Sequence, residues 1–458
     1  MSVSASGRPR ASVLDFLDGS PTPAHAVELA RSYLISAGFE ELSEREVWTV
    51  EPGMRLFCTR GGTSIVACLA GELPPSRTGF RVIAAHTDFP CLRLKPKAAQ
   101  ALSGYSVLRA EVYGSPILAT WFDRDLGLAG RLWLRAPDSG GGPGMQELLF
   151  STGALCRIPS LAIHLDRQVN EEGFKFNRED NMLPVCGVGQ EDPDLTGMIA
   201  ESAGVDPERV AAFAADLYDV QPAATGGRCG ELLLSGRLDN LAMCHCGLRA
   251  IESCPPGLHT CVLALFDSEE VGSRTSAGAF SNFLSSILER LAVPTTGKEQ
   301  GMTGSRQDLF VALSRSMILS ADAAHALHPG FGDRHDSSHR PVLNSGPVLK
   351  VNASMRYSTT AATAGYLRQC AGVAGVPVQD LVMRNDRPCG STIGPILSSA
   401  LGAASIDVGN PILSMHSVRE TGGTADHEMM IRLMEAHFGP EVPLDPWIAP
   451  SRGSGQVE

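Results

Sequence analysis

Two spacings of apolar residues divide the chain into helical and extended segments. Early in the chain apolar residues recur at helical spacing, which predicts helices over Val13–Gly19 and Ala24–Ala37 and a turn over Glu40–Glu44. Apolar and β-branched residues dominate Leu56–Leu69 and Phe80–Ala85, which predicts strands there. The chain therefore starts as a mixture of helices and strands.

The stretch from about Lys95 to Arg228 has a different pattern. Short apolar segments separated by Gly and Pro predict strands over Ser106–Tyr113, Leu128–Leu134, Glu147–Ser151 and Ala162–Asp166. Pro222–Gly230 is typical of a linker that returns the chain to its first domain. We therefore expect residues 95–228 to form an inserted, mainly β domain.

Beyond this linker, strands and helices alternate. The predicted elements are a helix over Leu241–Ile251, a strand over Thr260–Phe266, a helix over Ala277–Leu291, a strand over Met317–Ser320 and a helix over Ala361–Ala371. Such alternation favours a sheet covered by helices on both faces. The predicted fold class is α/β, with a three-layer α/β/α domain built from residues 1–94 and 229–458. Two polar, glycine-containing segments, Ser139–Gly144 and Pro294–Asp308, are predicted to be loops.

Charge and cysteine usage narrow the possible partners. The 458 residues include 38 Lys and Arg against 50 Asp and Glu, a net charge of −12, which argues against nucleic acid or an anionic membrane as partner. No apolar run of roughly 18 residues and no signal-like segment is found, so no membrane association is expected. The 12 cysteines are scattered and suggest no disulfide framework, which favours the cytoplasm.

Metal-type side chains lie next to several predicted elements. His86 and Asp88, Glu269 and Glu270, Asp322 and His416 follow apolar runs, and Asp239 precedes a predicted helix. Taken singly, each of these residues is explained by a capping aspartate or a core histidine. In α/β folds, however, ligands bind at the carboxyl ends of strands, so the residues taken together indicate one site. Two histidines and three carboxylates describe a site for two divalent ions with one bridging carboxylate, and zinc fits best, with cobalt or manganese as substitutes. Of the two adjacent glutamates, one can hold a metal while the other acts as a general base.

These residues stand in longer motifs that resemble the aspartyl aminopeptidase family. The motifs fall in the expected order over roughly residues 15 to 438, and they include residues 86–93, 121–125, 163–165, 237–241, 269–272, 320–329, 339–341, 384–395 and 415–420. The resemblance implies a di-zinc peptidase domain and an inserted dimerisation domain.

The resemblance also implies a role for each site residue. His86, Asp239 and Asp322 would hold one metal, and Asp239, Glu270 and His416 the other. Glu269 would be the general base, Asp88 would orient His86, and the Asp239–Asn240 peptide bond would be cis. The resemblance implies roles for three further residues. His164 would reach the active site of a neighbouring subunit, and Lys350 would bind an acidic side chain of the substrate. His325 would lie near the pocket.

The implied function is a metalloaminopeptidase that removes an N-terminal Asp, and next Glu, from short peptides. A metal-bridged hydroxide would attack the peptide carbonyl with Glu269 as base. The resemblance further implies self-association into a homododecamer. Two alternatives remain open at this point: a broad-specificity di-metal aminopeptidase, and an inactive, particle-forming relative that kept only the fold.

Overall fold

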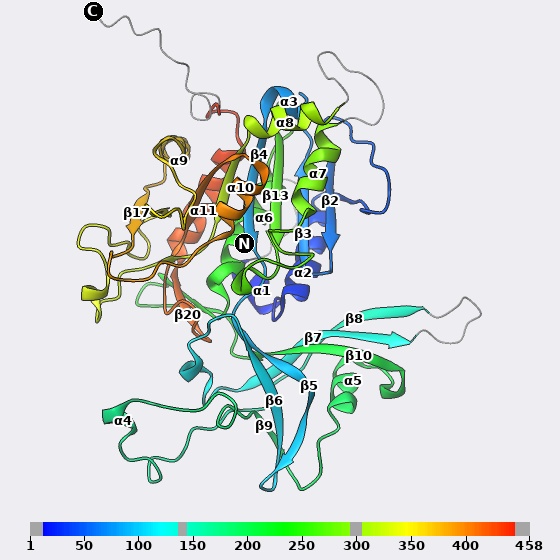
Figure 1. The fold of residues 1–458 in the computed structure, drawn as a ribbon, viewed down its shortest axis with the longest axis vertical. Helices are drawn as coiled ribbons and strands as arrows, with labels where there is room; N and C mark the ends of the chain where they lie inside the picture. Colours follow the sequence, from blue (N-terminus) through cyan, green and yellow to red (C-terminus); the bar gives the residue numbers. More distant parts are fainter. Residues whose placement is uncertain (1–11, 136–143, 294–304, 445–458) are drawn as a thin grey trace, which may run out of the picture.

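The computed structural model describes residues 12–135, 144–293 and 305–444, and three sheets organise them (Figure 1). The largest has nine strands. In spatial order they are β1 (Glu40–Glu41), β2 (Arg55–Arg60), β3 (Ser64–Leu69), β13 (Thr260–Phe266), β4 (Phe80–His86), β14 (Met317–Ala321), β18 (Ala404–Gly409), β16 (Val348–Val351) and β17 (Gln379–Val382). The central strands β13, β4, β14 and β18 are parallel, so their carboxyl ends share one edge of the sheet.

Helices cover this sheet on both faces. Every residue of β4 is buried, and successive residues point into two different cores: Phe80, Val82 and Ala84 into one, Ile83 and Ala85 into the other. The first core is closed by α7 (Phe283–Ala292), α8 (Arg306–Ser314) and α10 (Ile393–Leu401). The second is closed by α1 (Val13–Asp18), α2 (Pro23–Ser36), α6 (Leu238–Ser253), α9 (Ala361–Ala374) and α11 (Thr424–Phe438). The sheet with helices on both faces confirms the predicted α/β fold class with three layers. Strands that are buried on both faces require this covering.

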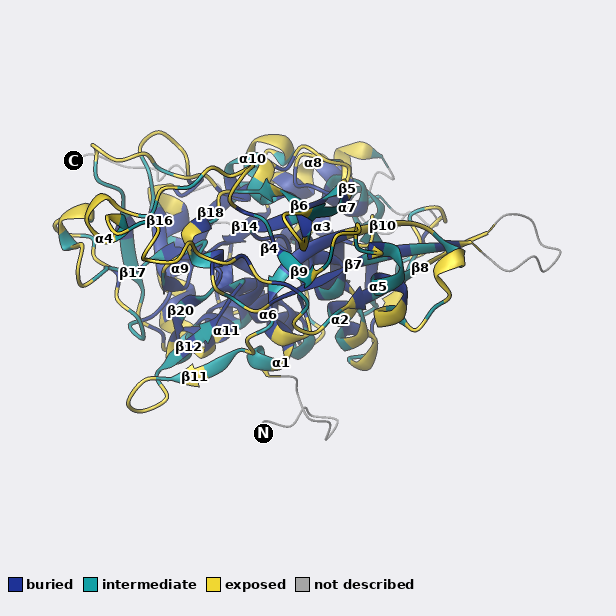
Figure 2. Ribbon diagram, turned by 90° about the horizontal axis from the view of Figure 1, so that it is seen from below, coloured by how far each residue is buried: buried dark blue, intermediate teal, exposed yellow. Residues whose placement is uncertain are grey.

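A second, six-stranded sheet lies beside the first one, at the bottom of Figure 1. Its strands are all antiparallel, in the order β8 (Met145–Ser151), β7 (Leu126–Arg135), β10 (Val210–Asp219), β5 (Cys91–Leu102), β6 (Tyr105–Tyr113) and β9 (Val185–Val188). The helices in the same stretch are α4 (Val169–Glu172) and α5 (Leu195–Ala203). Figure 2 shows α4 on the surface, and none of its residues is buried. A dimerisation role for this sheet stays a prediction, as do the domain limits at residues 95 and 228.

A third sheet of five strands joins segments that are far apart in sequence. Its order is β11 (Ala224–Gly226), β12 (Leu232–Ser235), β20 (Glu420–Gly423), β19 (Pro411–Leu413) and β15 (Ala324–His325). Because β19 and β20 flank residue 416, this sheet holds the loop that carries His416. Within the described ranges, the other short elements are α3 (Pro75–Thr78) and four 3-10 turns, Leu118–Trp121, Pro207–Arg209, Glu269–Val271 and Gly332–Arg334.

Most predicted elements are confirmed, and five are wrong in part or in whole. Ala162–Asp166 forms turns rather than a strand, because its apolar residues find no neighbouring strand and stay exposed. The helix expected from Ala277 starts only at Phe283. The turn at Glu40–Glu44 starts with the short strand β1, and the linker Pro222–Gly230 contains β11. Of the two predicted loops, residues 139–143 and 294–304 lie outside the described residues, and the end of the second loop is wrong because residues 306–308 form the first turn of α8. None of the described helices has the length and apolar character needed to cross a membrane.

Candidate metal centre

Three adjacent parallel strands deliver four of the candidate residues to one edge of the large sheet. His86 is the last residue of β4 and pairs in register with Phe266, the last residue of β13. Asp322 follows directly after β14, on the other side of β4. Glu269 and Glu270 do not continue β13 but lie on the 3-10 turn Glu269–Val271, which begins three residues after the end of the strand. On this turn both glutamate side chains can face the edge of the sheet. In an extended strand, two consecutive side chains would point to opposite faces.

Asp239 and His416 arrive from outside the parallel strands. Asp239 lies at the start of α6, where its φ and ψ are not helical, and the Asp239–Asn240 peptide bond is cis, as the resemblance implied. His416 lies beyond β19 with φ 66°, in the left-handed region that non-glycine residues rarely adopt. Both residues are therefore placed by local backbone geometry as well as by packing.

The five candidate ligands converge. Nε2 of His86 lies 3.6 Å from Oδ1 of Asp239, and Nε2 of His416 lies 3.3 Å from both Oδ2 of Asp239 and Oε1 of Glu270. Two groups of three residues share Asp239, and the ligand atoms of each group lie within 4.8 Å of one another. The groups are His86, Asp239 and Asp322, and Asp239, Glu270 and His416.

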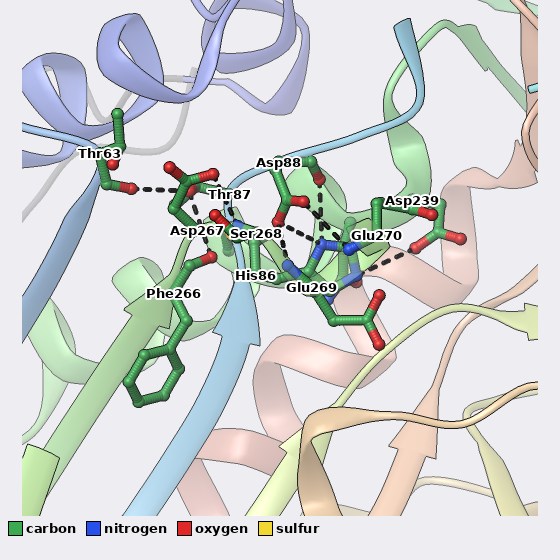
Figure 3. A network of polar contacts seen from close by, with 12 residues as sticks. Thr63, His86, Thr87, Asp88, Asp239, Phe266, Asp267, Ser268, Glu269 and Glu270 are labelled. Atoms are coloured by element: carbon green, nitrogen blue, oxygen red, sulfur yellow. Dashed lines mark hydrogen bonds and ion pairs between the residues drawn. The ribbon is translucent and has the colours of Figure 1, made fainter. Parts of the chain in front are cut away.

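Asp88 connects the histidine to the two glutamates (Figure 3). Its carboxylate accepts hydrogen bonds from the backbone N–H of Glu269 at 3.0 Å and of Glu270 at 3.1 Å. Its backbone carbonyl lies 2.9 Å from Nδ1 of His86, closer than its carboxylate at 3.4 Å. A proton on Nδ1 leaves Nε2 of His86 free as a ligand atom facing Asp239. Asp88 thus holds His86 mainly through its main chain, and its carboxylate holds the turn of the glutamates.

The electrostatics of the centre fit a divalent metal. Asp239 is buried, yet its Oδ1 has no hydrogen-bond partner. Burial raises the pKa of Glu269 to about 8. The charge of His86 lowers this pKa, whereas the carboxylates of Asp322 and Glu270 raise it further. For His416, burial opposes protonation, but the carboxylates of Asp239 and Glu270 outweigh it and raise the pKa to about 11. Several carboxylates buried together need positive charge beside them, and their oxygens and the imidazole nitrogens are the donors that zinc prefers.

The centre opens into a cavity of about 250 Å³. Lys350 and His325 line this cavity together with the candidate ligands and Glu269. The side chain of Lys350 is 3% exposed, and its ammonium lies 3.3 Å from Oδ1 of Asp322 and 5.3 Å from the centre of the Tyr357 ring. Burial, helped by the charge of Lys350, lowers the pKa of His325 to about 4, so this imidazole is neutral near pH 7. His164 is exposed and is not among the residues that line the cavity of its own chain.

One buried residue of the centre was not assigned a role from sequence. Glu420, the first residue of β20, accepts a hydrogen bond from the backbone N–H of Asp239 at 3.1 Å and another from that of His416 at 2.7 Å. It is 2% exposed, and burial, followed by the charge of Asp239, raises its pKa to about 8. Its sequence signal is a place at the end of the motif 415–420, four residues after His416, since burial of a carboxylate cannot be read from the chain.

The histidines that follow Asp322 do not join the centre. His335 accepts a hydrogen bond from the backbone N–H of His328, and His339 lies 2.8 Å from a carboxylate oxygen of Asp336. Of this run, only His325 lines the cavity. The local spacing of these histidines therefore reflects loop structure.

Comparisons with known proteins agree over nearly the whole chain. The family described as aminopeptidase I zinc metalloprotease (M18) matches residues 16–438. A probable M18 family aminopeptidase 2 of Stutzerimonas stutzeri is 41% identical over 93% of this chain and 97% of its own length. An aspartyl aminopeptidase of Aspergillus oryzae is 40% identical over 94% of this chain and 95% of its own. The solved mApe1 dodecamer of S. cerevisiae superimposes with a TM-score of 0.80 at 29% identity, over 93% of this chain and 95% of that one.

The chain belongs to the aminopeptidase I zinc metalloprotease family (M18).

Proposed function

We propose that the centre holds two divalent metals, with zinc the expected ion and cobalt or manganese as substitutes. His86, Asp239 and Asp322 would hold one, and Asp239, Glu270 and His416 the other. The support is the pair of three-residue groups that share Asp239, whose buried Oδ1 accepts no hydrogen bond from the described residues. When bound, such metals acidify a coordinated water and polarise a peptide carbonyl.

Glu269 is the proposed general base. It lines the same cavity and lies close to His86 and Glu270, with which it forms a further group of possible ligand atoms, but it belongs to neither of the two groups that share Asp239. Its carboxylate would accept the proton of the attacking water and return it to the leaving amine. The backbone N–H of Glu269 is anchored on Asp88, which holds the side chain over the cavity.

The proposed substrate is a short peptide with Asp, and next Glu, at its N-terminus. The observation that carries this proposal is the buried ammonium of Lys350 in the wall of the cavity. A buried cation binds a carboxylate strongly because water does not screen the pair. The relative from Aspergillus oryzae is named an aspartyl aminopeptidase, which agrees with this choice.

Replacement of Lys350 by methionine tests the substrate class. We expect kcat/KM for an aspartyl anilide to fall by about 10²-fold or more, since one partner of a buried charge pair is lost. Turnover of a leucyl anilide should change only a few-fold. Lys175→Met, at a lysine whose side chain is 75% exposed, serves as the control. Equal losses on both substrates, with metal content unchanged, would favour a broad-specificity aminopeptidase instead.

Self-association is the last part of the proposal. We propose a homododecamer in which the exposed His164 reaches the cavity of a neighbouring subunit and assists the reaction there. The mApe1 structure of S. cerevisiae is a dodecamer, and that likeness is the support. Native mass spectrometry should give about twelve times the 48.5 kDa chain mass; a monomer or dimer would remove this part of the proposal. The inactive, particle-forming alternative is disfavoured because Glu269 and all five proposed ligands are present.

A further inference from the structure

The segment that follows strand β6 of the inserted sheet lies directly against the metal centre. Tyr113 is the last residue of β6, and Gly114 follows it with φ 70°. A Cβ at Gly114 would lie 3.2 Å from the Cβ of Glu270, so only glycine lets the backbone pass there without displacement. The carbonyl oxygen of Ser115 lies 3.0 Å from Nδ1 of His416. Two of the proposed ligands are thus contacted by the exit of the inserted sheet.

Tyr113 itself contacts the residue that holds the glutamates. Its hydroxyl donates a hydrogen bond to Oδ2 of Asp88 at 2.8 Å, the same oxygen that accepts from the backbone N–H of Glu270. Burial raises the pKa of Tyr113, so the phenol stays protonated and can only donate to a carboxylate.

The ring of Tyr113 is held by the inserted sheet. The guanidinium of Arg93, on β5, lies 4.6 Å from the ring centre. Arg93 in turn binds both carboxylate oxygens of Asp216, on β10, at 2.7 and 3.2 Å. A bidentate pair of this kind fixes the guanidinium plane, and with it the ring that it covers. The hydroxyl therefore has a position set by three strands of the inserted sheet.

We infer that Tyr113 is a positioning residue for the reaction. Through Asp88 it fixes the turn that carries Glu269 and Glu270, so the inserted sheet sets the geometry of the base and of one ligand. The inference rests on the proposed function, which supplies the roles of these two glutamates. A hydrogen bond to a buried carboxylate is charge-assisted and strong, and groups that orient metal ligands typically change affinity or activity by roughly 10- to 100-fold.

The test removes a single oxygen atom. Tyr113→Phe should lower kcat by roughly 10- to 100-fold and weaken zinc binding, measured by competition with a chelator, by about 10-fold. KM should stay within about twofold of the wild type. Tyr366→Phe is the control, since the hydroxyl of the buried Tyr366 also makes a hydrogen bond to a side chain, 2.9 Å from Nδ1 of His437 and outside the centre. This control should lose thermal stability and keep kcat and zinc affinity.

A double-mutant cycle tests whether Tyr113 acts through Asp88. With Asp88 already replaced by asparagine, the further change Tyr113→Phe should lower kcat and zinc affinity by less than about twofold. The inference is overturned if Tyr113→Phe keeps kcat and zinc affinity within about twofold of the wild type, if Tyr366→Phe matches its losses, or if the two losses multiply in the double variant. A zinc-loaded wild-type chain without aminopeptidase activity would instead remove the proposed function, and the chelator competition would still decide the role of Tyr113.

Discussion

Glu269→Gln is expected to lower kcat by about 10³-fold while two metals per chain remain bound. General acid–base catalysis contributes about 10²- to 10⁴-fold, and glutamine has the shape of glutamate but accepts no proton. The backbone N–H of Glu269 still reaches Asp88 in this variant, so the fold of the turn is unchanged. The measurement is kcat on an aspartyl anilide together with metal content from mass spectrometry of the purified protein.

The neighbouring glutamate provides the comparison for this experiment. Glu270 lies on the same 3-10 turn and differs mainly in direction, with its Oε1 at 3.3 Å from Nε2 of His416. Glu270→Gln should therefore lose metal as well as activity. Near-normal turnover of Glu269→Gln with both metals present would show that another group is the base, and metal loss in both variants would show that both glutamates are ligands.

Asp239→Asn is expected to have the second large effect, on both metal positions at once. Asp239 is the one residue shared by the two groups, and its two oxygens face different histidines. Asparagine offers one oxygen and an amide that donates hydrogen bonds, so it cannot bridge two cations. Metal content should fall from two per chain to one or less, and kcat/KM should fall by roughly 10³-fold or more, because the metals generate the nucleophile.

A buried aspartate elsewhere separates this effect from general destabilisation. Asp426, on α11, is fully buried and accepts hydrogen bonds from the backbone N–H of Asn344 and Gly346. Asp426→Asn should lower the melting temperature and leave two metals bound. If Asp239→Asn retained two metals and the Asp426 variant lost them, the shared-ligand assignment would have to be abandoned.

Predictions from local sequence succeeded where residues of a single strand decide the outcome. The strands Phe80–Ala85, Thr260–Phe266 and Met317–Ser320 form as predicted, and each is wholly buried. Parallel strands end at one edge, so the pattern of an apolar run followed by a polar residue also places His86 and Asp322 near each other. The direction of Glu269 and Glu270 depended on the 3-10 turn, which the run of apolar residues does not show.

Predictions failed where the outcome depended on backbone pairing or packing that the apolar pattern does not report. Leu161, Ile163 and Leu165 alternate as in a strand, but no neighbouring strand pairs with them, and they remain 60%, 47% and 74% exposed. The helix expected from Ala277 starts only at Phe283, and before it Gly278 packs closely against the backbone of Ser273, where a Cβ would lie 2.2 Å from the carbonyl oxygen. The spacing of apolar residues shows neither the lack of a partner strand nor this close approach.

The sequence by itself determined the α/β class, the family resemblance and the metal-type residues, because these depend on residue type and short-range order along single elements. Only the tertiary structure decided which backbone groups hold those residues. Tyr113 reaches Asp88 from the inserted sheet, and Glu420 holds Asp239 across 181 residues of chain. Such contacts depend on how separate sheets pack, and burial of a polar side chain follows from that packing rather than from its neighbours in sequence.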